Sequence, residues 1–95
     1  MGNLFTREFV IIDPSGFHAV PVSRLAQLAK ESAYPILAHD RISGPILATS
    51  HLRLLALGLH QGQTLKISIA TQDEQAANLV FEAVQQLLQP TPPLG

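Results

Sequence analysis

His18 is the residue in this chain whose neighbours best suit it to chemistry. It follows Asp13-Pro14-Ser15-Gly16, whose residue types match a type I turn, and it precedes a predicted helix with Pro21 in its first turn. The first N–H groups of a helix lack intrahelical acceptors and stabilise an anion, and the helix dipole disfavours a cationic imidazole there. A neutral, nucleophilic ring beside an anion site has the components that a reversible N–P bond requires.

The backbone around His18 would hold the anion. The pattern assigns this role to the N–H groups of Ala19 and Val20 at the helix start, together with Ser15 and Gly16 in the preceding turn. A histidine before a helix is also commonly a solvated or capping residue, so its position alone leaves both roles open.

Two other kinds of site are excluded by spacing. Asp13, Ser15 and His18 lie within one turn and no oxyanion motif accompanies them, so a serine triad is not predicted. The other histidines show no H-x-H or H-x₃-H pair, so neither a metal site nor a cofactor is expected. These histidines are His39, His51 and His60.

The composition narrows the class of protein. A chain of 95 residues makes one domain, and the absence of cysteine excludes a disulfide scaffold and a cysteine nucleophile and fits the cytoplasm. The net charge of −1 disfavours a nucleic-acid partner, and no apolar run reaches the ~20 residues that a membrane helix needs. We therefore expect a cytoplasmic domain that neither binds nucleic acid nor inserts into a membrane.

The periodicity predicts elements in the order β-α-β-β-α-β-α. Strands are expected over residues 5–12, 34–39, 45–48 and 64–70, and helices after His18, after Ser50 and after a Thr71–Glu74 capping box. The third strand should lie at an edge, because Pro45 cannot donate to a central ladder. One antiparallel sheet with helices on a single face would bury every amphipathic stripe, which makes this an α+β (broadly α/β) domain.

The spacing of apolar residues along the predicted helices and strands predicts which residues form the core. The expected core positions are Val22, Leu25, Ala26 and Ala29 in the first helix, Leu65, Ile67 and Ile69 in the last strand, and Ala76, Val80, Ala83, Val84 and Leu87 in the last helix. Thr64, Lys66 and Ser68 should face water. The Pro-rich residues 90–95 have the composition of a stiff linker, which leaves residues 1–89 as the domain.

Segments of the chain match, in order, the motifs of a known family. Gly16-Phe17-His18-Ala19-Val20-Pro21 resembles an active-site motif G-L-H-A-R-P, and residues 49–59 resemble a K-S-initiated helix that ends in L-G-[L/I]. Residues 61–67 resemble the entry to that family's last strand, and residues 73–77 resemble the D/E-E-x-x-A start of its last helix. The family is HPr, the histidine-containing phosphocarrier of the bacterial phosphotransferase system, and the resemblance covers nearly the whole chain.

The resemblance implies both a fold and an activity. The fold is an open-faced β-sandwich, in which helices cover one face of an antiparallel sheet with strand order 1-4-2-3. The activity is that of a carrier with a phosphohistidine intermediate rather than a free-standing enzyme. Nδ1 of His18 would accept a phosphoryl group from an Enzyme I-type donor and pass it to a sugar-specific A-type domain, free or fused in one chain. Ser50 aligns with a serine that a kinase phosphorylates in some bacteria, although a helix N-cap is the simpler role.

The chain departs from the family at Val20, where the family has an arginine that helps to neutralise the phosphoryl group. Arg24 and Arg53 are the candidate substitutes. The patch that corresponds to the family's partner-docking surface comprises Val20, Ser23, Gln27, His51, Leu52 and Leu55. A short helix must bury something, so Leu52 and Leu55 belong either to this surface or to the core.

Two functions from different classes stay open. The intact run from Gly16 to Pro21 favours a phosphocarrier, whereas Val20 favours a regulatory docking module with impaired phosphotransfer. A generic small-ligand domain would explain the pattern of elements but not the run around His18.

Overall fold

Strands and helices follow one another along the chain in the predicted order. The structure is a computed structural model that describes residues 3–90. Its elements are β1 (Leu4–Val10), α1 (Ala19–Glu31), β2 (Ile36–Asp40), β3 (Gly44–Leu47), α2 (His51–Ala56), β4 (Thr64–Ala70) and α3 (Glu74–Leu87). No helix within this range is long and apolar enough to cross a membrane.

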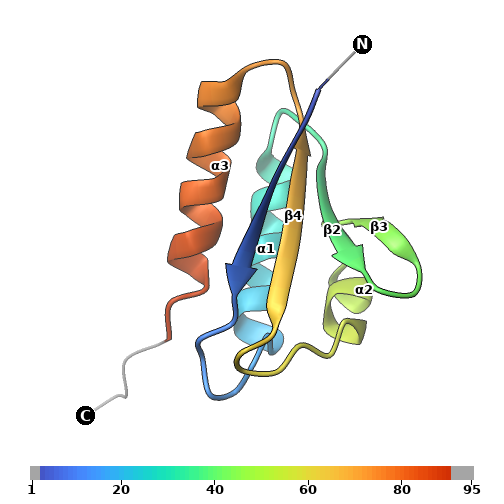
Figure 1. Cartoon of the computed structure of the whole chain (residues 1–95), viewed down its shortest axis with the longest axis vertical. Coiled ribbons are helices and arrows are strands. Elements are labelled where there is room, and N and C mark those ends of the chain that lie inside the picture. The colour runs from blue at the N-terminus through green and yellow to red at the C-terminus, as the bar shows by residue number, and fades with distance from the viewer. Residues whose placement is uncertain (1–2, 91–95) are drawn as a thin grey trace.

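The strands form one antiparallel sheet in the order β1-β4-β2-β3. β3 lies at an edge, as Pro45 predicts, and Pro45 pairs with His39 of β2. The three helices α1, α2 and α3 cover one face of the sheet and leave the other face open (Figure 1). The predicted open-faced β-sandwich is confirmed.

Alternating residues of β4 form the centre of the core. Leu65, Ile67 and Ile69 are fully buried, and α1 turns its predicted apolar stripe toward them. Pro21 is buried in the first turn of α1, where its missing N–H removes no helical hydrogen bond. Each buried leucine or isoleucine side chain contributes about 1.5–3 kcal/mol. This layer therefore holds α1, and with it the start of the helix, firmly against the sheet.

The buried face of α3 differs from the prediction by about one position. Most of the predicted positions are only half-buried, namely Ala76, Val80, Ala83 and Leu87. The buried positions are Ala77, Phe81, Val84 and Leu88. The Phe81 ring lies 6.1 Å from the ring of Phe9, and the guanidinium of Arg7 stands 4.7 Å above it. Phe81 is the largest apolar side chain of the helix, and its packing sets which face meets the sheet.

The start of α3 also differs from the prediction. Asp73 is the N-cap, with its Oδ1 accepting the N–H groups of Gln75 at 3.0 Å and Ala76 at 3.3 Å. Thr71 Oγ1 accepts the N–H of Asp73, the residue that directly precedes the helix, and not an N–H of the helix itself. The predicted Thr71–Glu74 capping box is therefore wrong, because Asp73 is an equally good cap that lies closer to the helix. Residue 90 follows the end of α3, and the rest of the predicted linker lies outside the described residues.

Ser68 is buried, although the alternation of β4 predicts that it faces water. It lies on the open face of the sheet, where its hydroxyl is 2.7 Å from Thr6 Oγ1 and 2.8 Å from His39 Nε2. These neighbours come from the two strands that flank β4. Partial burial, and then the positive charge of Lys66, lowers the pKa of His39. The open face therefore carries a small polar cluster that excludes water from Ser68.

The turn before α1 contacts the loop before β4. The N–H of Gly16 donates to the Asp13 carbonyl at 2.8 Å, which confirms the predicted turn, and the N–H of Phe17 donates to the Leu59 carbonyl at 2.9 Å. Gly16 has φ of +73°, and a Cβ there would stand 2.5 Å from the Leu59 oxygen. Phe17 is buried beneath this contact. Glycine is therefore required at position 16 by backbone conformation and by space.

Lowering the pH should weaken the fold through His39. Its folded-state pKa is below the unfolded value of 6.5, so its stabilising contribution is complete above pH 6.5 and is lost as the pH falls toward the lowered pKa. Urea unfolding at about pH 7.5 and about pH 5.5 measures this loss. His39→Gln should flatten the dependence, and His60→Gln at an exposed position should not. Equal pH dependence in wild type and His39→Gln would contradict the assignment.

Gly16→Ala should destabilise the protein by more than the ~1–2 kcal/mol that a left-handed backbone costs an alanine, because its Cβ also meets the Leu59 carbonyl. Gly44→Ala is the matched control, since Gly44 has φ of +76° and nothing within 4 Å of its Cβ position. Denaturant unfolding of both variants separates the two effects. Equal destabilisation would show that the Leu59 contact is no constraint.

Candidate functional site

His18 is the N-cap residue of α1, but its side chain does not cap the helix. Its backbone is extended, with φ of −94° and ψ of −171°, and its carbonyl accepts the N–H of Val22 at 3.0 Å. The side chain is 34% exposed. The structure thus removes the capping role that the sequence leaves open and presents the ring at the surface, at the start of the helix.

Asp13 holds one nitrogen of this ring. Its Oδ2 lies 3.2 Å from His18 Nε2, and its Oδ1 accepts the N–H of Ser15 at 2.8 Å. The Ser15 N–H, and after it the His18 ring, lowers the pKa of Asp13, so the side chain is a carboxylate at neutral pH. No hydrogen bond within residues 3–90 joins Ser15 to His18, as a serine triad would require.

The sequence predicts Asp13 as a turn residue and excludes a serine triad with His18, so the direct pairing of Asp13 with His18 is not predicted. The feature of the sequence that could have indicated this pairing is the turn itself. A turn that reverses the chain between Asp13 and Gly16 brings the side chain of its first residue back toward the residue that follows it.

The four residues assigned to the phosphate site have different backbone environments. The N–H groups of Ser15 and Gly16 both donate to Asp13. The N–H groups of Ala19 and Val20, in the first turn of α1, have no acceptor in the described part of the chain, and both residues are exposed. The open donors beside His18 are therefore these two, at the positive end of the helix dipole.

The two candidate arginines lie in different places. Arg24 is exposed on α1, one turn after Val20. Arg53 lines a shallow cavity of about 200 Å³ with Asp40, Ser43 and residues of β3 and α2. Arg53 thus lies beside the turn between β2 and β3, whereas Arg24 shares a helix with His18.

The predicted docking patch lies on two helices that pack against each other, α1 and α2. Leu52 is 80% exposed, Val20 43% and Leu55 37%, whereas Leu54 is fully buried and serves as the core residue of α2. The structure therefore places both leucines of the patch on the surface. Its polar members are exposed or half-buried, namely Ser23, Gln27 and His51.

Ser50 is the N-cap of α2, as predicted. Its hydroxyl accepts the N–H of Arg53 at 3.3 Å, and its backbone carbonyl accepts the N–H of Leu54. This hydrogen bond satisfies one of the N–H groups that a helix start leaves without a partner.

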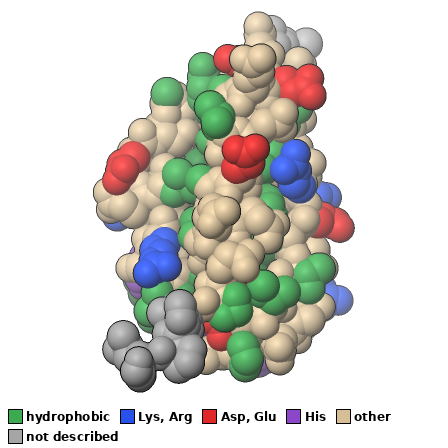
Figure 2. All heavy atoms as spheres, turned by 90° about the vertical axis from the view of Figure 1, so that its left-hand side faces the viewer, with side chains coloured by type: hydrophobic (Ala, Val, Ile, Leu, Met, Phe, Trp, Pro, Cys, Tyr) green, Lys and Arg blue, Asp and Glu red, His purple; other side chains and the backbone are tan. Residues whose placement is uncertain are grey.

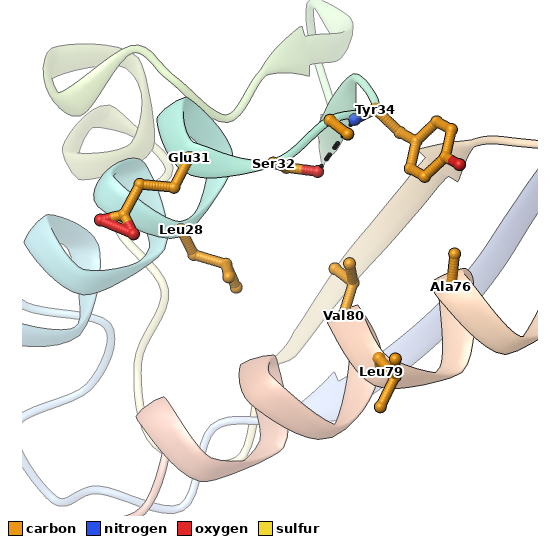
Figure 3. A pocket seen from close by; sticks show the side chains of 8 residues that line it. Leu28, Glu31, Ser32, Tyr34, Ala76, Leu79 and Val80 are labelled. Atoms are coloured by element: carbon orange, nitrogen blue, oxygen red, sulfur yellow. Dashed lines mark hydrogen bonds between the residues drawn. The ribbon is translucent and has the colours of Figure 1, made fainter.

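A further hollow of the described surface lies away from His18. An apolar groove of about 270 Å³ runs between the end of α1 and the first half of α3, with Leu28, Tyr34 and Leu79 among its walls (Figure 3). The length of α1, about 1.5 Å for each residue, separates this groove from the helix start.

On the face over α3, acidic and basic side chains are interspersed with hydrophobic ones (Figure 2). Within residues 3–90 no group of histidine or acidic side chains has the arrangement of a metal site.

Comparison with known proteins gives the same match along nearly the whole chain. A family model described as "PTS HPr component phosphorylation site" matches residues 5–89. The phosphocarrier protein HPr of Lysinibacillus sphaericus is 35% identical over 83 residues, which cover 87% of this chain and 90% of that protein.

Solved structures share the fold. Phosphocarrier protein HPr from Bacillus anthracis str. Ames superposes with a TM-score of 0.72 at 17% identity, over 90% of this chain and 98% of that chain. HPr-C-His from Thermoanaerobacter tengcongensis gives 0.68 at 23% identity, over 88% and 94% of the two chains. At these identities the solved structures show a shared fold only. The family model and the Lysinibacillus sphaericus relative show membership of the family. With its surface histidine at the start of α1, the chain belongs to the HPr family, the histidine-containing phosphocarriers of the phosphotransferase system.

Proposed function

We propose that this chain carries a phosphoryl group on Nδ1 of His18, taking it from an Enzyme I-type donor and passing it to a sugar-specific A-type domain. One observation carries the proposal. The His18 side chain is 34% exposed and caps nothing, and the backbone that directly follows it carries the open N–H groups of Ala19 and Val20. A nucleophile followed directly along the chain by donors for an anion supports the proposal.

The transfer uses the lone pair of a ring nitrogen. As that nitrogen bonds to phosphorus, the bond between phosphorus and the donor breaks, and the donor keeps its electron pair. The return step to the acceptor is the same displacement with the roles exchanged. Such transfer depends mainly on positioning and on stabilising charge on the phosphoryl oxygens. The N–H groups of Ala19 and Val20 and the dipole of α1 provide that stabilisation here.

Val20 makes this stabilisation weaker than an arginine would. A charge-assisted hydrogen bond is roughly twice as strong as a neutral one, and arginine can donate two in parallel. We therefore propose a slow carrier, with Arg24 as the nearer of the two candidate cations along the chain and Arg53 as the other.

The proposal includes the surroundings of the site. Residues 1–89 act as the carrier domain in the cytoplasm, and residues 90–95 link it to a partner or leave it free. The patch on α1 and α2, centred on the exposed Val20, Leu52 and Leu55, is where donor and acceptor dock. Ser50 acts first as a helix cap, and its phosphorylation by a kinase is a further part of the proposal.

A regulatory docking module is the second candidate. The observation that favours it is the apolar side chain at position 20, which is 43% exposed on the helix that packs against the helix of the two exposed leucines. Such a module would bind its partners through this surface without passing on phosphate.

His18→Ala should abolish phosphorylation and leave the fold intact, because the side chain makes no helix-capping hydrogen bond and is only partly buried. Incubation with Enzyme I and labelled phosphoenolpyruvate, followed by a test for acid-labile label, measures the first effect. Circular dichroism during heating measures the second. His60→Ala is the matched control and should keep its label. Label on His18→Ala would refute the assignment of the carrier residue.

Val20→Arg should speed phosphorylation of His18 about tenfold, which corresponds to about 1.4 kcal/mol of transition-state stabilisation. Leu79→Arg adds the same charge to an exposed position on α3 and should leave the rate unchanged. The rate of label uptake from Enzyme I measures both. If the wild type is already as fast as Val20→Arg, another cation stabilises the phosphoryl group, and Arg24→Ala and Arg53→Ala identify it. If neither form takes up label, the docking module is the function.

A further inference from the structure

We infer that Asp13 is a positioning residue for His18, which keeps the ring proton on Nε2 so that Nδ1 presents its lone pair to phosphorus. This inference rests on the proposed function for its purpose, but the control of the ring proton stands on the contact between the two side chains alone.

The two oxygens of Asp13 have separate partners. Oδ1 accepts the N–H of Ser15 at 2.8 Å, and Oδ2 lies 3.2 Å from His18 Nε2. An ionised carboxylate can only accept hydrogen bonds. The group that faces Oδ2 must therefore be an N–H, and a neutral imidazole has only one. The proton thus belongs on Nε2, and Nδ1 keeps its lone pair.

Asp13 is itself held in place. Its carbonyl accepts the N–H of Gly16, its Oδ1 accepts the N–H of Ser15, and its side chain is only 17% exposed. The Gly16 backbone, in turn, lies against the Leu59 carbonyl. The carboxylate therefore needs no reorganisation to orient the ring. A histidine oriented in this way by a carboxylate is a recurring device for fixing which nitrogen reacts.

The contact also acts during transfer. When Nδ1 bonds to phosphorus and the bond to the donor breaks, the ring gains positive charge while the proton on Nε2 stays where it is. The Asp13 carboxylate faces that proton and stabilises the charged ring. The carboxylate meets the ring at Nε2 and not at the nitrogen that bears the phosphoryl group. Its repulsion of the phosphoryl oxygens is therefore smaller than its attraction for the ring.

Asp13→Asn tests the inference with little change of shape. The new Oδ1 can still accept the Ser15 N–H, which turns the amide NH₂ toward His18 Nε2. Nε2 must then accept, and the ring proton moves to Nδ1. The corresponding Asp-to-Asn change in a serine protease leaves the geometry intact and lowers the rate about 10⁴-fold through the wrong tautomer. Here we expect phosphorylation of His18 to slow at least ~10-fold, since the reactive nitrogen loses its lone pair.

The position of the His18 ring proton distinguishes this role from a purely structural one, because a purely structural role for Asp13 would not change it. Nitrogen NMR of the neutral His18 ring should show the proton on Nε2 in the wild type and a gain of the Nδ1–H form in Asp13→Asn. Asp73→Asn is the matched control, because Asp73 also accepts an N–H two residues further on and faces no histidine. It should change neither the His18 spectrum nor the rate.

The outcomes separate this inference from the proposed function. A proton on Nδ1 in the wild type overturns the inference without need of any variant, and so does an Asp13→Asn spectrum identical to that of the wild type. If the proton moves as expected but the wild type takes up no label, Asp13 controls the ring while the carrier function fails. If the proton moves and phosphorylation keeps its full rate, Asp13 has no part in transfer, and its positioning role is refuted.

Discussion

The hydrogen bond from the Phe17 N–H to the Leu59 carbonyl joins the turn before α1 to the loop before β4, and the site depends on it. The bond requires the backbone at Gly16 to approach Leu59 more closely than any side chain would allow. Next to it, the N–H groups of Ile11 and Gly62 bond across the same pair of segments. His18, the residue before α1, directly follows this contact. Here it is fixed from one side by this loop and from the other by the buried stripe of α1.

That rigidity gives the two nitrogens of one ring different surroundings. A carboxylate lies on the Nε2 side, and the open N–H groups at the start of α1 belong to the backbone that directly follows the ring. The carboxylate thus contacts one nitrogen of the ring, and the proposed anion donors belong to a different part of the backbone. In the carrier that we propose, valine at position 20 leaves the stabilisation of the anion to backbone dipoles, whose orientation the helix sets. In that carrier the strength of the nucleophile matters more, and the proposed role of the Asp13 contact is to act on that property.

The strands, the edge position of β3 and the position of His18 could be predicted from strong local signals, whereas the full strand order was implied by the family resemblance. β4 alternates without a break, Pro45 excludes a central strand, and the run from Gly16 to Pro21 is specific. The face of α3 could not be predicted to the residue. Neighbouring alanines at positions 76 and 77 fit either stripe, and only the contact of Phe81 with β1 distinguishes them. Ser68 and Asp13 were missed for a shared reason. Their partners are set by strand pairing and by the course of a turn, and neither appears in the periodicity of a single segment.

The position of Pro45 has a consequence for the protein in a crowded solution. An exposed sheet edge is a template on which the strand of another molecule can extend the ladder. β3 is only four residues long, begins at a glycine in the left-handed conformation and continues with a residue that has no N–H to offer. The opposite edge, β1, carries the exposed charged side chains of Arg7 and Glu8. Both margins of the sheet thus resist edge-to-edge extension of the ladder by a strand of another molecule.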